Sequence, residues 1–162
     1  MLGIEVLKEI SKLDNFLIHA TVRRKNDIKS VKNYLEDKKY PVKFLKFQIE
    51  KNYKAKLKKI LPNYNFVINC IGIIKPYIDD SDPESVQKAL LVNSLFPYFL
   101  NKFSNKKTKI FQIATDCVFD GKDGLYNEKF SHNAIDVYGK SKSLGEIKSE
   151  NFYNIRCSII GN

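Results

Sequence analysis

The segment Phe66-Val67-Ile68-Asn69-Cys70-Ile71-Gly72 is a short, unbroken apolar run that ends in small and polar residues. A run without alternating polar side chains is typical of a strand that is buried on both faces of a sheet. Comparable runs occupy residues 16–22, 42–47, 110–115 and 155–160. Because segments with apolar residues at helical spacing separate these runs, the sequence predicts an α/β fold, a doubly wound parallel sheet with right-handed crossovers.

The segments between the runs are the predicted helices. We expect them over residues 6–13, 28–35, 57–61, 83–103 and 137–148. The fourth helix begins at Pro83, which the first turn of a helix tolerates, and Ser81 or Asp82 can cap it. We expect Pro97 to kink this helix, because proline lacks a backbone N–H.

The composition describes one globular domain, which we expect to span residues 1–162. No apolar run approaches the ~18–20 residues that a membrane span needs, and the first residues are too charged for a signal peptide. We therefore expect a cytoplasmic protein without a membrane segment. Cys70, Cys117 and Cys157 are odd in number and lie far apart, so we expect neither a disulfide framework nor a metal site.

The strong positive charge raises the question of a nucleic-acid partner. The sequence has 28 Lys and Arg against 18 Asp and Glu, which gives a formal net charge of +10. Only Arg23, Arg24 and Arg156 are arginines, the residue that specific phosphate and base contacts favour, and the lysines are spread along the chain. We therefore favour a solvated, lysine-coated surface and expect no nucleic-acid partner.

Small and polar residues follow three of the predicted strands. These clusters are Arg23-Arg24, Asn69-Cys70-Ile71-Gly72 and Thr115-Asp116. Because ligands bind at the carboxyl ends of strands in open α/β sheets, we expect the functional site there.

Tyr138-Gly139-Lys140-Ser141-Lys142 places a phenol and an ammonium group four residues apart, which is one face of a helix. A nearby cation favours the phenolate, so we expect Lys142 to lower the pKa of Tyr138 toward the range of acid–base catalysis. The alternative is a surface tyrosine that packs beside a lysine.

Further motifs on both sides give this pair a context. Ala114-Thr115-Asp116-Cys117-Val118-Phe119-Asp120-Gly121 follows a predicted strand, Tyr126-Asn127-Glu128 comes next, and residues 138–146 read YGKSKSLGE. In this order the motifs resemble the extended short-chain dehydrogenases/reductases that act on nucleotide sugars, most closely the dTDP-4-dehydrorhamnose reductase group. Three further segments are similar to this family as well: residues 69–72, Val92-Asn93 with Pro97, and residues 156–161. The resemblance implies a Rossmann-like, NAD(P)-binding domain.

The resemblance also implies a catalytic trio of Thr115, Tyr138 and Lys142. Tyr138 would protonate a sugar carbonyl oxygen, Thr115 would hydrogen-bond the same oxygen, and Lys142 would lower the phenol pKa and hold the nicotinamide ribose.

The residues around this trio depart from the family pattern. The usual Ser before the Thr is Ala114 here, and the usual Tyr after the Asp is Cys117. Nucleotide-sugar dehydratases carry a Glu at the latter place, so Cys117 disfavours dehydration. We expect Cys117 to be a small buried residue, and Asp116 and Glu128 to be loop-capping carboxylates.

The cofactor half of the resemblance is partial. Met1-Leu2-Gly3 looks like the end of the family's glycine-rich motif, with Leu2 and Gly3 beside the pyrophosphate; the first strand and the first two glycines are absent. By resemblance Asn69, Cys70, Ile71 and Gly72 would also contact the cofactor. Where an acidic residue would select NAD, the chain has Arg23, which favours NADP(H) over NAD(H).

The family resemblance implies NADPH-dependent reduction of a 4-keto nucleotide sugar, for deoxysugar and cell-surface polysaccharide biosynthesis. Two alternatives stay open: a nucleotide-sugar epimerase, and a non-catalytic dinucleotide-binding subunit like the regulatory subunit of methionine adenosyltransferase. Members of the family run to roughly twice this length, so we expect a partial domain that lacks the first strand and the C-terminal substrate-binding part. The intact protein is a possible homodimer.

Overall fold

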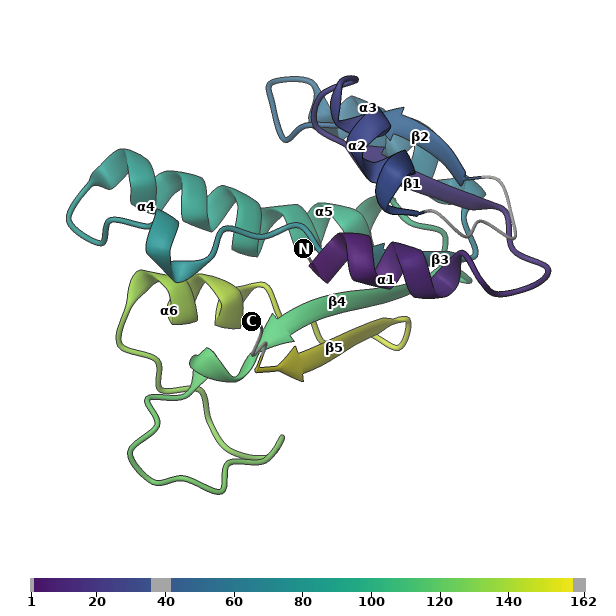
Figure 1. Cartoon of the computed structure of the whole chain (residues 1–162). Helices are drawn as coiled ribbons and strands as arrows, with labels where there is room; N and C mark the ends of the chain where they lie inside the picture. The colour runs from purple at the N-terminus through teal and green to yellow at the C-terminus, as the bar shows by residue number, and fades with distance from the viewer. Residues whose placement is uncertain (1, 36–41, 159–162) are drawn as a thin grey trace. The chain divides into compact units, whose positions relative to one another are not determined.

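A computed structural model describes residues 2–35 and 42–158, which fall into two compact units, Met1–Tyr53 and Lys54–Asn162 (Figure 1). In each unit helices alternate with strands, and the strands of each sheet pair in parallel. The predicted α/β class with parallel strands is therefore confirmed.

The first unit is a small layer of helices on a two-stranded sheet. It contains α1(Leu2–Ile10), β1(Ile18–Val22), α2(Asp27–Tyr34) and β2(Val42–Lys46), and β1 pairs with β2 from Ile18↔Val42 to Val22↔Lys46. Its core is built from apolar residues of both helices and both strands, namely Leu7, Ile10, Ile18, Ala20, Val31, Leu35, Val42 and Phe44. Between the helices the Tyr34 hydroxyl donates to the Glu5 carboxylate.

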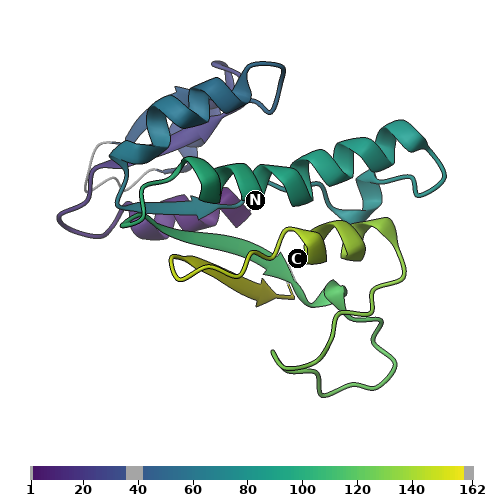
Figure 2. The same ribbon diagram turned by 180° about the vertical axis from the view of Figure 1, so that it is seen from behind.

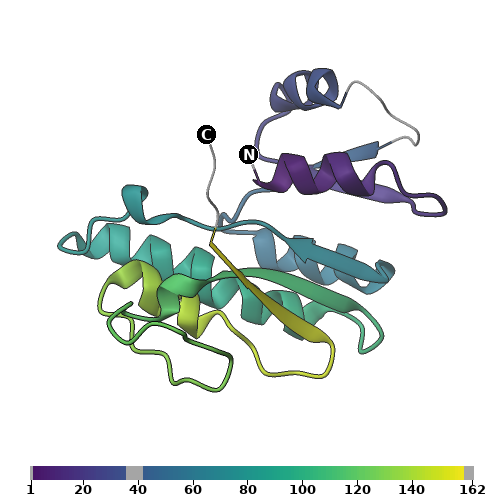
Figure 3. The same cartoon turned by 60° about the horizontal axis from the view of Figure 1, so that its bottom comes forward.

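The second unit is built on the three-stranded sheet β3(Phe66–Asn69), β4(Lys109–Thr115) and β5(Phe152–Cys157), with β4 in the middle. A long helical stretch and α6(Val137–Leu144) lie on the same side of this sheet (Figure 2). Along β4 the residues that face the helices, Ile110, Gln112 and Ala114, are buried, whereas Phe111 and Ile113 are only partly covered. Figure 3 shows the strands from the side that these helices leave open.

Shorter elements precede β3 and follow β3 and β4. They are α3(Tyr53–Ile60), which starts at the last residue of the first unit, and the 3-10 turns η1(Leu61–Asn63), η2(Lys75–Tyr77) and η4(Asp116–Val118).

The predicted helix over residues 83–103 consists of α4(Pro83–Ala89), the π-helical segment η3(Leu90–Leu95) and α5(Phe96–Phe103). Asp82 caps it, since its carboxylate accepts from the N–H groups of Glu84 and Ser85. The irregularity expected at Pro97 therefore lies in the turn before this proline. A proline ring clashes with the carbonyl four residues earlier, here that of Asn93, and a wider π turn relieves such a clash.

Further expectations differ from the structure. The helices predicted over residues 6–13, 57–61 and 137–148 are α1(Leu2–Ile10), α3(Tyr53–Ile60) and α6(Val137–Leu144). The described residues form two sheets and not one, because no described strand pairs β1 with β3. The last strand begins at Phe152, earlier than the predicted residue 155, while residues 159 and 160 lie outside the described part of the chain.

The end of α6 packs tightly against η3. A Cβ added at Gly145 would lie 2.0 Å from the carbonyl oxygen of Asn93, so this position admits no side chain without a backbone shift. Gly139, in the first half of α6, is equally constrained, with the Cys117 carbonyl oxygen 2.3 Å from such a Cβ. Glycine at both positions is what lets α6 approach the site.

We predict that Gly145→Ala lowers the free energy of unfolding by about 1–3 kcal/mol, as overpacking of a tight contact does. The measurement is urea denaturation of the chain. Leu144→Ala is the control, because Leu144 is 56% exposed and its loss should change the stability by less than about 0.5 kcal/mol. Equal stabilities of Gly145→Ala and the wild type would contradict this packing.

Candidate active site

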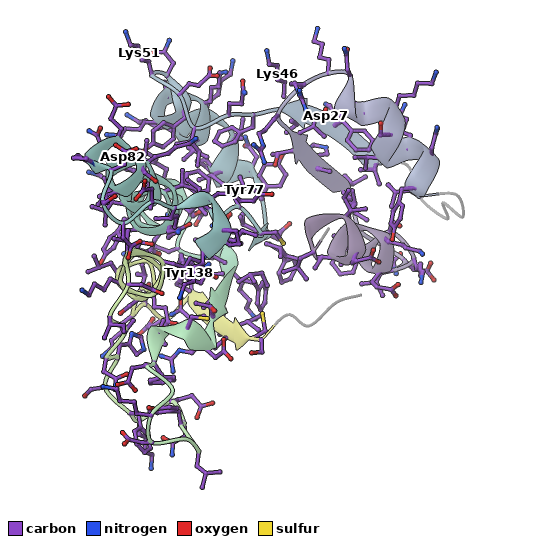
Figure 4. All side chains as sticks on the ribbon, turned by 60° about the vertical axis from the view of Figure 1, so that its left-hand side comes forward. Asp27, Lys46, Lys51, Tyr77, Asp82 and Tyr138 are labelled. Carbon is purple, nitrogen blue, oxygen red and sulfur yellow. The ribbon has the colours of Figure 1, made fainter. Side chains whose placement is uncertain are left out.

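The candidate site lies at the carboxyl ends of β3, β4 and β5. Thr115 is the last residue of β4 and the N-cap of η4, and α6 brings Tyr138 and Lys142 to the same place. Asp136 starts α6, since its carboxylate accepts from the Gly139 N–H at 2.7 Å. Figure 4 shows Tyr138 in the first turn of α6 and Tyr77 on η2, the turn that follows β3.

The Thr115 hydroxyl lies near the Tyr138 phenol, because it acts on the phenol as a hydrogen-bonding group that lowers the pKa of Tyr138. The buried Thr115 hydroxyl also accepts from the Cys117 N–H at 3.2 Å. Burial raises the pKa of Tyr138, and the bond from Thr115 opposes this only in part. The expected lowering of this pKa by Lys142 is therefore wrong for this structure: desolvation of the phenolate dominates.

Lys142 is buried below the sheet edge, with an exposed fraction of 8%. Its ammonium group donates to the carbonyl oxygen of Ile113 at 2.7 Å. Burial lowers the pKa of Lys142, while the Cys157, Glu146 and Cys70 side chains act in the opposite direction. A buried ammonium with three N–H groups and one bond to Ile113 is suited to hold a further oxygen ligand.

Residues 69–72 form the turn after β3. The Asn69 amide donates to Gln112 at 2.7 Å and its oxygen accepts from the Ile71 N–H at 3.1 Å, so this side chain shapes the turn. Burial raises the pKa of Cys70, which keeps the thiol protonated. Gly72 lies next to the lysine, since a Cβ there would be 3.8 Å from the Lys142 Nζ. The turn thus approaches the site with its backbone.

Asn93 is a site residue to which the sequence analysis assigned no role. It is buried in η3, and its side chain bonds both backbone groups of Ile73, accepting from the N–H at 2.8 Å and donating to the carbonyl at 2.9 Å. It also donates to the Ser141 hydroxyl at 3.1 Å. Asn93 therefore joins the turn after β3 to α6. The available sequence signal is the motif Val92-Asn93 followed by Pro97, which sets a polar residue in a largely apolar helical stretch.

Asp116 collects hydrogen bonds beside the trio. Its carboxylate accepts from the Thr115 hydroxyl at 3.3 Å, from the Ser158 hydroxyl, and from the Cys117 thiol at 3.7 Å. The bond from Ser158 is the main cause of the lowered pKa of Asp116. The expectation that Cys117 is buried is wrong: as the second residue of η4 it is exposed, on the side of Lys75 and Tyr138.

The turn η2 fastens the start of α6. The Lys75 ammonium lies 2.7 Å from the Asp136 carboxylate, and the Asp80 carboxylate accepts from the Val137 N–H at 3.1 Å. These contacts fix the helix turn that carries Tyr138. No local sequence pattern predicts these contacts, because the partners are about 60 residues apart in sequence.

The first unit holds the remaining predicted cofactor residues. Leu2 and Gly3 are in the first turn of α1. A hollow of about 440 Å³ at the end of β1 is lined by Arg23, Arg24, Asp27 and Gln48. Because Asp27 already pairs with Arg24, whose Nε lies 3.4 Å from its carboxylate, Arg23 is the arginine of this hollow that is better placed for an anion.

The described residues contain neither a membrane-spanning helix nor a metal-binding cluster. None of the helices there is both long enough and apolar enough to cross a membrane. Within residues 2–35 and 42–158, no three His, Cys, Asp or Glu side chains gather in a way that could hold a metal ion.

Comparison with protein families gives one match, which covers almost the whole chain. The family described as RmlD substrate binding domain matches residues 1–160. No curated protein is similar enough to count as a match.

Solved structures share the fold. UDP-glucuronic acid 4-epimerase from Bacillus cereus has a TM-score of 0.72 at 19% identity, over 90% of this chain and 47% of its own. A dTDP-4-dehydrorhamnose reductase from Clostridium acetobutylicum has a TM-score of 0.59 at 23% identity, over 87% of this chain and 52% of its own. A hypothetical dTDP-4-dehydrorhamnose reductase from Sulfolobus tokodaii has a TM-score of 0.63 at 22% identity, over 86% and 55%. The chain spans about half the length of these proteins.

We predict that Thr115→Val raises the pKa of Tyr138 above its wild-type value, because the Thr115 hydroxyl favours the phenolate. The measurement is a titration of the tyrosine ring carbons by NMR, with Tyr138→Phe to assign the signal. Thr21→Val, a substitution at an exposed strand position of the first unit, is the control and should leave the Tyr138 titration unchanged. An unchanged or lower pKa in Thr115→Val would contradict the effect of the Thr115 hydroxyl on Tyr138.

Proposed function

Because the chain belongs to the RmlD substrate binding domain family, we propose that it carries the reducing centre of an NADPH-dependent nucleotide-sugar reductase, with a 4-keto sugar as substrate. The observation that carries the proposal is the position of Thr115 at the carboxyl end of β4, near enough to Tyr138 to lower the phenol pKa, with buried Lys142 on the same helix as Tyr138. Two hydroxyls that converge on one point can both bond one carbonyl oxygen.

Tyr138 is the proton donor of the proposed reaction. The raised pKa keeps the phenol protonated at neutral pH, so it has a proton to give. As the carbonyl oxygen gains negative charge, the Tyr138 proton passes to it, and the Thr115 hydroxyl stabilises the oxygen through a second hydrogen bond.

The residues of the chain fit a nicotinamide dinucleotide. When bound, this cofactor supplies the hydride to the carbonyl carbon. Lys142 has N–H groups for the ribose beside the nicotinamide, and Gly72 leaves the space next to the ammonium open. Arg23 in the hollow at the end of β1 would hold the additional phosphate of NADPH, and Leu2 and Gly3 at the start of α1 would face the pyrophosphate. Asn69, Cys70 and Ile71 would take part through their backbone.

The wider assignments follow from this reaction class. We propose a cytoplasmic enzyme that supplies a deoxysugar for cell-surface polysaccharide, in which residues 1–162 are part of a Rossmann-type domain and two copies of the intact protein form a homodimer. A nucleotide-sugar epimerase would use the same Tyr138 and Lys142 but return the hydride to the sugar. A non-catalytic dinucleotide-binding subunit would bind the cofactor and turn over no sugar.

Turnover of a dTDP-4-keto sugar with NADPH tests the proposal. We predict net formation of NADP⁺ by the wild type, and a rate about 10²–10⁴-fold lower for Tyr138→Phe, the usual range for loss of a general acid. Tyr98→Phe is the matched control, because Tyr98 is a half-exposed residue of α5 and its substitution should leave the rate unchanged.

The other outcomes separate the alternatives. Sugar inversion without net NADP⁺ would favour the epimerase, and NADPH binding without turnover of any keto sugar would favour the regulatory subunit. Undiminished hydride transfer in Tyr138→Phe would remove the proposed mechanism.

A further inference from the structure

His132 lies in a compact polar cluster outside the catalytic trio. Its Nδ1 is 2.6 Å from the Ser143 hydroxyl, and its Nε2 is 2.6 Å from an Arg156 guanidinium nitrogen. Arg156 also donates two bonds to the Glu146 carboxylate, at 2.8 and 2.7 Å. The cluster joins three parts of the second unit: the segment after η4, the end of α6, and β5.

The geometry fixes the protonation state of His132. A guanidinium group can only donate hydrogen bonds, so the Nε2 atom beside Arg156 must be an acceptor and carry no proton. The Nδ1 atom then holds the ring proton and donates it to Ser143. A second proton would turn Nε2 into a donor that faces another donor at 2.6 Å. The arrangement therefore exists only with a neutral imidazole.

The charged groups around the His132 ring do not offset the cost of protonating it. Burial is the main cause that lowers the pKa of His132, and Arg156 and Lys148 lower it further. Glu146, whose carboxylate is 3.6 Å from Nε2, acts in the opposite direction, but it already forms the two bonds to Arg156. The bonds to Glu146 are the main cause of the raised pKa of Arg156, and Glu128 in the loop raises it further.

The same cluster holds the loop over residues 119–134. The Phe119 ring stacks on Tyr126 at 4.4 Å, meets His132 edge-on at 5.6 Å, and lies 5.4 Å from the Arg156 guanidinium. At the far end of the loop the N–H groups of Asn133 and Ala134 both donate to the Val118 carbonyl oxygen, at 3.1 and 3.0 Å.

The two ends of this loop adjoin the proposed catalytic groups. Before it come Thr115 and η4, and after it comes Asp136, the cap of the helix that carries Tyr138. Loss of the contacts of His132 would therefore release the loop that connects Thr115 to the helix of Tyr138 and Lys142.

We propose that His132 is a proton-sensitive latch, which holds the loop over residues 119–134 against α6 and β5 when neutral and releases it when protonated. The direction follows from linkage: a histidine that is harder to protonate in the closed loop than in the open one favours opening as the pH falls below its ordinary pKa. The effect on turnover rests on the proposed function, whereas the latch itself is tested without any substrate.

The first test is the ring state of His132 in the wild-type chain, measured by long-range ¹H–¹⁵N NMR. The sequence contains two histidines, so His19→Gln leaves His132 as the one remaining signal. We expect the Nδ1–H form at pH 7.5 and a titration midpoint below the ordinary value of 6.5. An Nε2–H form, or a midpoint at or above 6.5, would overturn the proposal.

The second test is hydrogen exchange of the loop, followed by mass spectrometry and corrected for the intrinsic pH dependence of exchange. If the His132 midpoint lies one pH unit below 6.5, the equilibrium constant for opening the loop should be about tenfold larger at low pH than at pH 7.5. Each further pH unit should add another factor of about ten. This loss of protection should occur in the wild type and in His19→Gln and should be absent in His132→Gln.

Exchange that depends on pH equally in His132→Gln, or that stays constant in the wild type, would contradict the latch. If His132→Gln does not fold, two wild-type quantities still test the proposal. The factor by which low pH increases loop opening must match the factor calculated from the shift of the His132 midpoint below 6.5. A mismatch would contradict the latch. Neither readout needs turnover, so failure of the latch and failure of the proposed reductase are separate results.

Discussion

The buried amide of Asn93 is the joint on which the arrangement of the site depends. One side chain bonds the backbone of Ile73, which follows the β3 turn, and the hydroxyl of Ser141, which lies beside Lys142 in α6. A buried amide that loses its hydrogen bonds destabilises the protein, so these bonds hold η3, the segment after β3 and α6 at fixed distances from one another. The π turn around Asn93 and the absence of a side chain at Gly145 complete this close packing.

Burial decides the electrostatics of the site. It raises the pKa of Tyr138 and lowers the pKa of Lys142, so both shifts favour the neutral forms. Hydrogen bonds act against burial at Tyr138 and Asp116, where hydroxyl groups favour the anion. A phenol that keeps its proton until an oxygen beside it becomes negative is what a reduction of a carbonyl requires. The same balance of burial and fixed charge recurs at His132, within the loop over residues 119–134.

The sequence predicts the elements of this fold better than their contacts. Unbroken apolar runs locate the strands, and the spacing from Tyr138 to Lys142 correctly places both on one helix. The exposed thiol of Cys117 and the raised pKa of Tyr138 were not predicted, because burial is a property of the assembled site and not of a local pattern. The role of Asn93 was missed for the same reason: its partners lie 20 and 48 residues away along the chain. The assignment of cofactor contacts to residues 69–72 stays a prediction.

The claim that the strand ends of this chain form a nicotinamide dinucleotide site is tested most directly by binding. We would titrate the purified chain with NADPH and with NADH, following nicotinamide fluorescence and melting temperature together. The account predicts saturable binding that raises the melting temperature, with NADPH bound more tightly than NADH because of Arg23. A folded chain that binds neither dinucleotide would contradict it.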